Sequence, residues 1–128
     1  MRPVSPGTLA PARGYSHGMR GSGELLFVAG QVGWNGAAQL VSDDFALQFG
    51  QALDNVLAVV REAGGSPESI GRLTIYVVDK GEYLARARDV GAVYRARMGR
   101  HFPAMALVEV KSLLEAGAKV EIEATALL

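Results

Sequence analysis

Cysteine is absent from this 128-residue sequence, which excludes disulfides, thiolate nucleophiles and cysteine-based metal sites. The two histidines, His17 and His101, are far apart and have no HxH or HExxH spacing. We therefore expect no built-in metal site and no cofactor. An excess of positive charge is missing too, because Lys and Arg total 13 and Asp and Glu total 13. This balance argues against a nucleic-acid partner.

Long apolar runs are also missing. No segment approaches the roughly 20 residues that a membrane helix requires, and residues 1–14 have no apolar signal core. We therefore expect no membrane partner and a cytoplasmic location. The length and the 49% hydrophobic content fit one compact domain spanning residues 1–128.

The apolar pattern predicts the order strand, strand, helix, strand, helix, strand, strand. Branched and aromatic runs predict strands over residues 24–32 and 70–78, and residues 14–20 can pair with the first of these. Apolar residues three and four positions apart predict helices over residues 42–65 and 79–99. Ser42 or Asp43 is expected to cap the first helix, and Asp79 the second.

The last quarter of the chain alternates as two further strands. Met105 and Leu107 face one way in the first, whereas Ala106 and Val108 face the other. In residues 119–127, Val, Ile and Ala share one face and the glutamates share the other. Two helices cover only one face of such a sheet.

The uncovered face of this sheet would keep apolar residues, among which we place Met105 and Leu107. Leaving apolar surface in water costs roughly 25 cal/mol per Å², so a surface of this kind usually meets a partner. We expect a homo-oligomer that packs through the open face of the sheet. A monomer with a partly hydrated sheet is the alternative.

Seven short segments, in this order and spacing, carry a family resemblance: GYSHG at 14–18, FVAGQ at 27–31, QALDNV at 51–56, VVD at 77–79, FPA at 102–104, VEV at 108–110 and VEIEA at 120–124. Together they resemble the Rid family (reactive intermediate deaminase, also called YjgF-like). The resemblance implies an α+β, chorismate-mutase-like fold, in which a mixed sheet carries two helices on one face. It also implies a homotrimer with an inner barrel of sheets and small-molecule pockets between subunits.

Rid members that hydrolyse 2-imino or enamine acids share a recognisable site. An arginine after the FPA segment binds the substrate carboxylate, a glutamate on the last strand positions water, and a tyrosine from the first strand completes the pocket. By this resemblance the glutamate is Glu121 and the tyrosine is Tyr15, whereas the arginine position holds Met105.

Two further positions depart from the family pattern. Ala29 stands where serine is frequent, beside Gly30, whose backbone belongs to the implied pocket, and Leu107 replaces a small residue or cysteine. Met105 cannot bind a carboxylate, and losing such a charge-assisted contact costs about 2–5 kcal/mol. We therefore expect simple imino acids such as 2-iminopropionate to be poor substrates.

Three other residues are candidates for the site. His17 lies two residues after Tyr15 on the same face of an extended segment and can act as a general base. Trp34 can stack on a ligand at the pocket mouth or lie in an interface. Arg100 can reach the rim of the cleft and replace the missing cation, or remain at the surface.

Two functions of different classes remain open. The first is hydrolysis of C=N bonds, with water activated near Glu121 and assisted by Tyr15 or His17, on a more apolar substrate than the usual imino acids. The second is a non-catalytic, small-molecule-binding homotrimer, in which Glu121 is a solvated or salt-bridged residue paired with Lys111 or Lys119. The endoribonuclease activity sometimes attached to the family is disfavoured, because the chain has no excess of positive charge.

Overall fold

The computed structural model describes residues 1–128. Its helices are α1 (Phe45–Glu62), α2 (Lys80–Ala85) and α3 (Ala87–Met98), with a 3-10 turn η1 (Pro67–Ser69). Its strands are β1 (Arg2–Val4), β2 (Gly18–Arg20), β3 (Leu25–Val32), β4 (Ile70–Val77), β5 (Ala104–Glu109) and β6 (Val120–Leu127).

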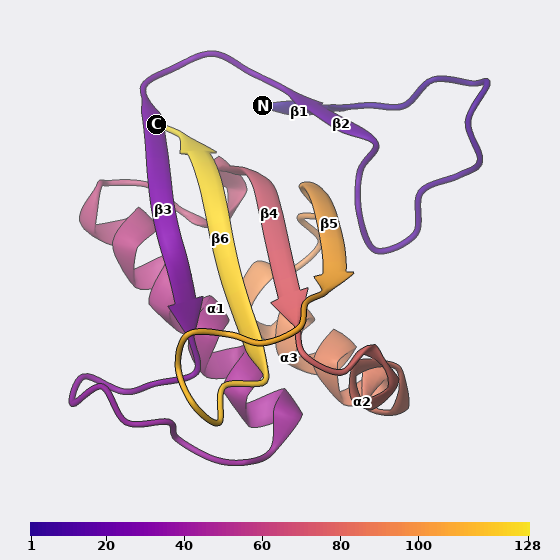
Figure 1. Ribbon diagram of the computed structural model, residues 1–128. Coiled ribbons are helices and arrows are strands. Elements are labelled where there is room, and N and C mark those ends of the chain that lie inside the picture. Colours follow the sequence, from indigo (N-terminus) through magenta and orange to yellow (C-terminus); the bar gives the residue numbers. More distant parts are fainter.

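Four strands form the main sheet, in the order β3-β6-β4-β5 (Figure 1). Strand β6 is antiparallel to both β3 and β4, whereas β4 and β5 are parallel. A parallel pair needs a crossover connection, and α2 and α3 provide it. Helix α1 packs on β3, β6 and α3, so the helices cover one face of a mixed sheet, as expected.

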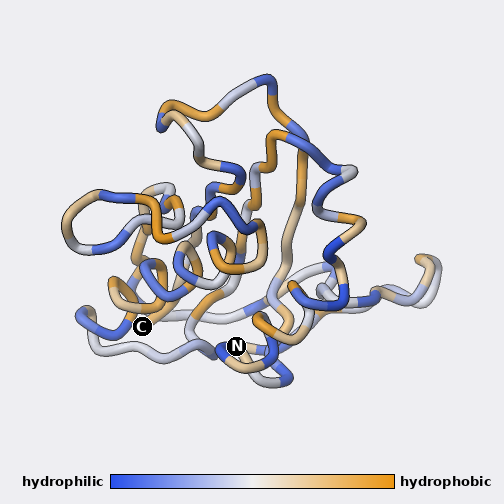
Figure 2. The backbone as a smooth tube through the Cα atoms, turned by 90° about the horizontal axis from the view of Figure 1, so that it is seen from below, coloured by the Kyte–Doolittle hydropathy of each residue, from blue (hydrophilic) through white to orange (hydrophobic).

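Alternation along β6 separates the core from the open face of the sheet. Val120, Ile122, Ala124 and Ala126 are buried on the helix side, whereas the residues between them are only half-buried. Along the coils of the helices, hydrophobic and hydrophilic residues recur within each turn, as in amphipathic helices (Figure 2). The strand pattern of the sequence is therefore confirmed here.

Helix α1 is capped by Asp44, not by Ser42 or Asp43. The Asp44 carboxylate accepts a hydrogen bond from the Leu47 N–H at 3.0 Å. The Ser42 hydroxyl accepts one from the Asp44 N–H at 2.9 Å and so orients the capping residue. The predicted start was wrong by one or two positions, because Asp and Ser are equally suited to this role in a sequence.

The single helix predicted over residues 79–99 is divided into α2 and α3, so the structure has three α-helices rather than two. Arg86 lies at the junction with φ −109° and ψ 15°, outside helical values. Its guanidinium bonds to Asp44 at the start of α1 and to Asp89. Asp79 caps the first of the two helices, as predicted.

The predicted pairing of residues 14–20 with β3 is wrong. Strand β2 pairs with β1 instead, in a small separate sheet. Residues 1–24, which we call the arm, extend past the end of the main sheet toward β5, the edge strand farthest from β3 (Figure 1). The Ser16 N–H donates to the Pro103 carbonyl at 3.1 Å and fixes the arm there.

The conformation of Gly23 explains why the arm turns away from the main sheet. Gly23 has φ +145°, a conformation that L-residues with a side chain rarely adopt. A Cβ atom there would lie 2.4 Å from the Leu128 carbonyl oxygen. Because Glu24 and Leu128 exchange backbone hydrogen bonds of 3.1 and 2.9 Å, the start of β3 is held against the end of β6. The chain therefore leaves the sheet at this point.

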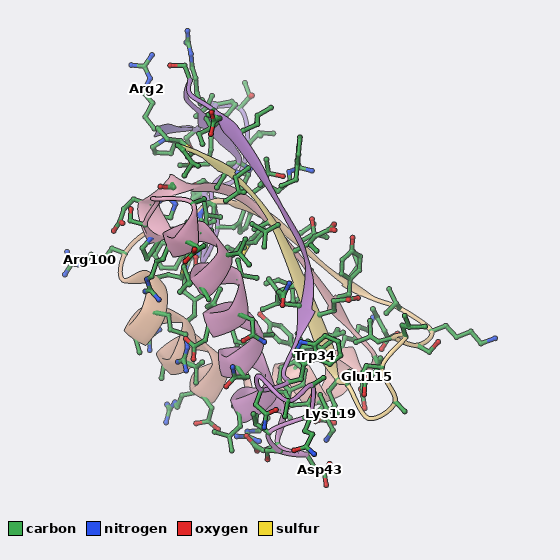
Figure 3. All side chains as sticks on the ribbon, turned by 90° about the vertical axis from the view of Figure 1, so that its left-hand side faces the viewer. Arg2, Trp34, Asp43, Arg100, Glu115 and Lys119 are labelled. Carbon is green, nitrogen blue, oxygen red and sulfur yellow. The ribbon has the colours of Figure 1, made fainter.

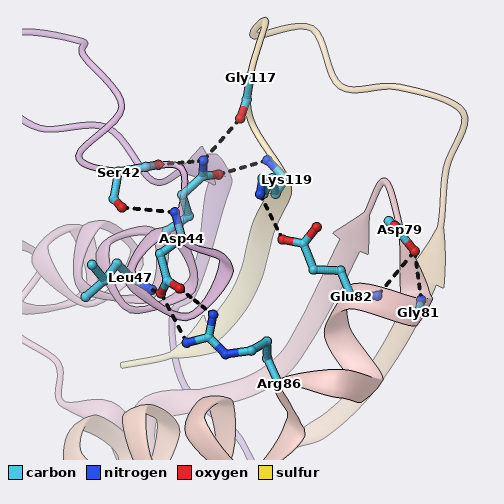
Figure 4. A network of polar contacts seen from close by, with 10 residues as sticks. Ser42, Asp44, Leu47, Asp79, Gly81, Glu82, Arg86, Gly117 and Lys119 are labelled. Atoms are coloured by element: carbon cyan, nitrogen blue, oxygen red, sulfur yellow. Dashed lines mark hydrogen bonds and ion pairs between the residues drawn. The ribbon is translucent and has the colours of Figure 1, made fainter.

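A buried polar side chain connects the helices to β6 (Figure 4). Gln48 is fully buried, and its amide nitrogen donates to the Ser42 carbonyl at 2.8 Å and to the Gly117 carbonyl at 3.1 Å. Its amide oxygen accepts the Lys119 N–H at 2.8 Å. The Lys119 ammonium pairs with Glu82 of α2 at 2.9 Å. That residues 1–128 form one domain stays a prediction.

Candidate functional site

A cavity of about 570 Å³ lies between β5, α3 and the arm, and we call it the β5 pocket. Ten of its fourteen lining residues are hydrophobic: Tyr15, Phe49, Ile75, Tyr83, Ala87, Val90, Tyr94, Phe102, Met105 and Leu107. The other four are Arg13, Gly14, Gly91 and Arg95. Concave, mostly apolar cavities with a few convergent polar groups are the usual form of small-molecule sites.

Met105 and Leu107 line this pocket from the helix-covered side of the sheet. The parallel register aligns Met105 with Leu73 and Leu107 with Ile75, both buried. Met105 and Leu107 pack against the same core cluster. The prediction that these two residues face the open side was wrong, because alternation within a strand does not reveal which face the helices cover.

Aromatic residues form one wall of the pocket. The rings of Tyr94 and Phe102 stack with centroids 5.5 Å apart and planes 11° apart. The Tyr94 hydroxyl donates to the His101 carbonyl at 2.7 Å, and burial raises the pKa of Tyr94. The His101 ring nitrogen Nε2 donates to the Ile70 carbonyl at 2.7 Å. These hydrogen bonds hold the wall in place, and the raised pKa of the buried Tyr94 keeps it neutral.

Tyr15 reaches the pocket from the arm, whereas His17 does not. The two rings meet edge to face, with centroids 5.4 Å apart. His17 is absent from the pocket lining, and its Nε2 donates to the Ala10 carbonyl at 2.6 Å. The arm is anchored beside them, since the Ser16 hydroxyl donates to the Phe102 carbonyl. Of the predicted catalytic residues, Tyr15 alone contacts this cavity.

Two arginines line the pocket, and they are not the one predicted. Arg13 comes from the arm and Arg95 from α3. Arg100 instead lines an adjoining hollow of about 350 Å³, together with Tyr15 and Phe102. No aspartate or glutamate lines the β5 pocket.

Glu121 and Gly30 lie on the opposite face of the sheet. A Cβ atom at residue 30 would be 2.7 Å from the Glu121 Oε1 atom, so this glycine makes room for the carboxylate. Ala29 is the preceding residue of β3 and is exposed. Lys119 pairs with Glu82 rather than with Glu121. Within one chain, Glu121 therefore does not meet Met105.

Glu123 lies two residues further along the same face and has a structural partner. The Tyr76 hydroxyl donates to its Oε1 atom at 2.6 Å. This hydrogen bond raises the pKa of Tyr76, and burial and the nearby charges of Glu123 and Glu121 add to the effect. Glu123 is thus engaged, whereas no side-chain hydrogen bond or ion pair holds the Glu121 carboxylate.

Trp34 lies outside the β5 pocket. Its backbone follows β3, and the Asn55 amide donates to the carbonyls of Val32 and Trp34 at 3.1 and 2.9 Å. Figure 3 shows Trp34 well apart from Arg100. The prediction that both residues border one ligand site between subunits stays a prediction.

Several residues that line the β5 pocket were not predicted from the sequence. Tyr83 and Tyr94 lie on the apolar stripe of the second predicted helix, and Phe49 lies on that of the first, which is the usual pattern of core residues. Their spacing shows that they share a helix face, but not that a cavity remains beside it. No sequence pattern marks Arg13 or Arg95 as a pocket residue, because arginines on a helix or near a terminus are usually solvated.

Other classes of site find no support in the structure. No group of three or more His, Cys, Asp or Glu side chains is placed to hold a metal ion. None of the helices has the length and apolar character needed to cross a membrane. The cytoplasmic location stays a prediction.

Comparison with known proteins identifies the family. The Endoribonuclease L-PSP family model matches residues 6–128. The chain is 36% identical over 121 residues to the RutC family protein y4sK of Sinorhizobium fredii, covering 94% of this chain and 89% of that one. It is 36% identical over 107 residues to the 2-iminobutanoate/2-iminopropanoate deaminase of Escherichia coli strain K12, covering 81% and 80%.

A solved structure agrees with these relatives. YyfB of Yersinia pestis, described as a protein of unknown function of the conserved Rid protein family, superimposes with a TM-score of 0.88 at 34% identity. The match covers 99% of this chain and 98% of that one. The fold is thus the α+β fold of YjgF-like proteins, and the chain belongs to the Rid family.

Proposed function

We propose that this protein hydrolyses the C=N bond of an imine or enamine whose body is larger and more apolar than that of a simple 2-imino acid, and that it does so in the β5 pocket. The observation that carries the proposal is the pocket wall, where Met105, Leu107 and Tyr15 meet in a mostly hydrophobic cavity. The 2-iminobutanoate/2-iminopropanoate deaminase among the relatives supports the reaction class.

The chemistry requires one water molecule and two proton transfers. Water attacks the imine carbon, and a carboxylate accepts its proton as the C–O bond forms. The carboxylate passes this proton to the nitrogen, which gives a carbinolamine. The second proton of the water then leaves the hydroxyl oxygen for the nitrogen as the C–N bond breaks, so the products are a carbonyl compound and ammonia. Glu121 is the carboxylate we assign to the water, and the Tyr15 hydroxyl can bond to the nitrogen, with His17 beside it.

This assignment needs a second copy of the chain, because Glu121 lies across the sheet from the pocket of its own chain. The open face on which it lies carries exposed apolar side chains beside the glutamates: Leu25 is 58% exposed, Phe27 75% and Val108 42%. Such a surface favours association. We propose the homotrimer that the family resemblance implies, with Glu121 of one copy completing the pocket of the next.

Substitution of Glu121 tests the catalytic part of the proposal. An imine can be generated in the assay by an amino-acid oxidase, and its hydrolysis followed as ammonia release. Glu121→Gln should lower the rate by about 10²–10⁴-fold, the usual contribution of a general base. Glu123→Gln, on the same strand and face, is the matched control and should keep most of the rate. Equal rates for the two variants would contradict the assignment.

Assembly is tested separately by light scattering after gel filtration. Phe27→Glu places a charge on the most exposed of these apolar side chains of the open face and should reduce the particle mass. Leu114→Glu is the control, because Leu114 is even more exposed than Phe27 but lies in the loop between β5 and β6. A monomeric wild-type protein would refute the intersubunit site.

A non-catalytic binding trimer is the second candidate function. It is favoured by the hydrogen bond that engages the His17 ring and by the absence of a carboxylate from the pocket lining. It predicts saturable binding of a small molecule with no acceleration of imine hydrolysis, and no effect of Glu121→Gln on either.

A further inference from the structure

We propose that Arg95, together with Arg13, is the anion-binding element of the β5 pocket, and that its ligand is a carboxylate carrying an aromatic body. The proposal rests on the proposed function for the location of the ligand. It adds the residues that bind the acid group and the class of molecule that fits.

The lining of the pocket is electrostatically one-sided. Arg13 and Arg95 are its only charged residues, and neither takes part in an ion pair or a side-chain hydrogen bond. By contrast, Arg86 and Arg97, from the same part of the chain, are paired with aspartates at 3.3 Å or less. Two unpaired cations beside an apolar cavity without a carboxylate attract an anion.

The guanidinium of Arg95 lies close over a glycine one turn earlier in the helix. Gly91 also lines the pocket, and a Cβ atom there would lie 3.2 Å from the Arg95 Nη1 atom. The guanidinium is therefore folded back along the helix over a residue that has no side chain. Glycine inside a helix is less favourable than alanine, and here it leaves space for the cation beside the cavity.

The arm provides the second cation. Arg13, Gly14 and Tyr15 are consecutive, and all three line the pocket. Gly14 has φ +75°, the left-handed conformation that glycine adopts without strain. This turn lets Arg13 and Tyr15 border the same cavity from one short segment, so a cation and an aromatic ring lie together at its edge.

The remaining wall indicates the body of the ligand. Five aromatic side chains line the cavity: Tyr15, Phe49, Tyr83, Tyr94 and Phe102. Aromatic rings pack well in stacked and edge-to-face arrangements, so this wall fits a planar apolar group. A guanidinium matches a carboxylate through two parallel hydrogen bonds. The two cationic groups thus come from α3 and the arm, and the thioether of Met105 contacts the apolar body of the proposed ligand.

Direct binding tests this assignment. The probe is phenylpyruvate, a stable 2-keto acid, titrated by calorimetry against the assembled protein, with 1-phenylpropan-2-one as the analogue that lacks the carboxylate. Wild-type protein should bind phenylpyruvate more tightly than the neutral ketone. Arg95→Gln should weaken phenylpyruvate binding by about 10–100-fold and leave the ketone unchanged, as expected for loss of a charge-assisted contact. Arg95→Lys should recover part of the loss.

Arg88→Gln is the matched control, because Arg88 is an exposed arginine of α3 that does not line the pocket and makes no ion pair. Equal weakening in Arg88→Gln and Arg95→Gln would overturn the proposal. So would equal affinity for phenylpyruvate and the ketone, no binding of either, or displacement of phenylpyruvate by an equal concentration of inorganic phosphate.

The binding assay separates this inference from the proposed function. If phenylpyruvate binds through Arg95 but Glu121→Gln does not alter imine hydrolysis, the binding site stands and the catalytic proposal fails. If Glu121 is required for hydrolysis but Arg95→Gln changes neither the KM for an aromatic imino acid nor the affinity for phenylpyruvate, the catalytic proposal stands and the inference fails.

Discussion

Replacement of Gln48 by leucine should destabilise the protein without changing its charge. Gln48 is fully buried, and its amide satisfies the Ser42 carbonyl, the Gly117 carbonyl and the Lys119 N–H. Leucine has a similar volume and none of these hydrogen-bonding groups. The variant therefore reports the contribution of the polar link between α1 and the start of β6.

The magnitude follows from the environment of each partner. Gly117 is exposed, so its carbonyl can bond to water after the change. Ser42 and Lys119 are only partly exposed, and an unsatisfied buried polar group costs about 1–3 kcal/mol. The leucine methyl groups recover about 1 kcal/mol through burial. With two such groups, the expected net loss is about 1–5 kcal/mol, a large part of the roughly 5–15 kcal/mol that stabilises a domain.

Urea unfolding followed by circular dichroism at one fixed protein concentration measures this loss, because the stability of an oligomer depends on its concentration. Gln39→Leu is the matched control: Gln39 is exposed, and its side chain makes no hydrogen bond, so its replacement should change the free energy of unfolding by less than about 0.5 kcal/mol. A Gln48→Leu midpoint equal to that of Gln39→Leu would refute the reasoning.

Two further predictions concern ion pairs. The hydrogen bond from Arg86 keeps the pKa of Asp44 below its ordinary value. The stabilisation that this pair provides is therefore complete above the unfolded-state pKa of about 3.9, and it is lost as the pH falls through the lower folded-state pKa. Unfolding midpoints measured downward from about pH 5 should therefore fall more steeply for wild-type protein than for Asp44→Asn, and parallel curves would contradict the role of the pair. Arg97 binds Asp54 through two hydrogen bonds of 2.7 and 3.1 Å between α3 and α1. A double-mutant cycle of Asp54→Asn and Arg97→Gln should give a coupling of about 0.5–1 kcal/mol that decreases in roughly 1 M salt, and a coupling insensitive to salt would exclude a simple surface ion pair.

The parts of the fold that the sequence predicted are those set by local periodicity. Alternation in residues 119–127 identifies the buried face of β6, and the apolar stripe of α1 identifies its core side. The capping role of Asp79 follows from the same local rules. All three were confirmed because they depend on neighbours within a few residues.

The parts that were wrong depend on contacts between distant segments. Alternation shows that Met105 and Leu107 share a face, but their sidedness is set by the parallel pairing with β4. The division of the second helix coincides with the ion pair between Arg86 and Asp44 of α1, 42 residues away. The location of the arm depends on Gly23, which has no Cβ atom and so fits against the carbonyl of Leu128 at the chain end. None of these contacts leaves a periodic pattern in the sequence.

Because of the arm, two variants that lack different arginines of the β5 pocket could restore intact pockets when they are mixed. It leaves the sheet at Gly23 and reaches β5 through contacts of Ser16 that would be the same if the strand belonged to another molecule. In an assembly whose copies exchange arms, each cavity would combine Arg13 of one polypeptide with Arg95 of another. Mixing a preparation that lacks only Arg13 with one that lacks only Arg95 would then regenerate some intact cavities, whereas unexchanged arms would regenerate none.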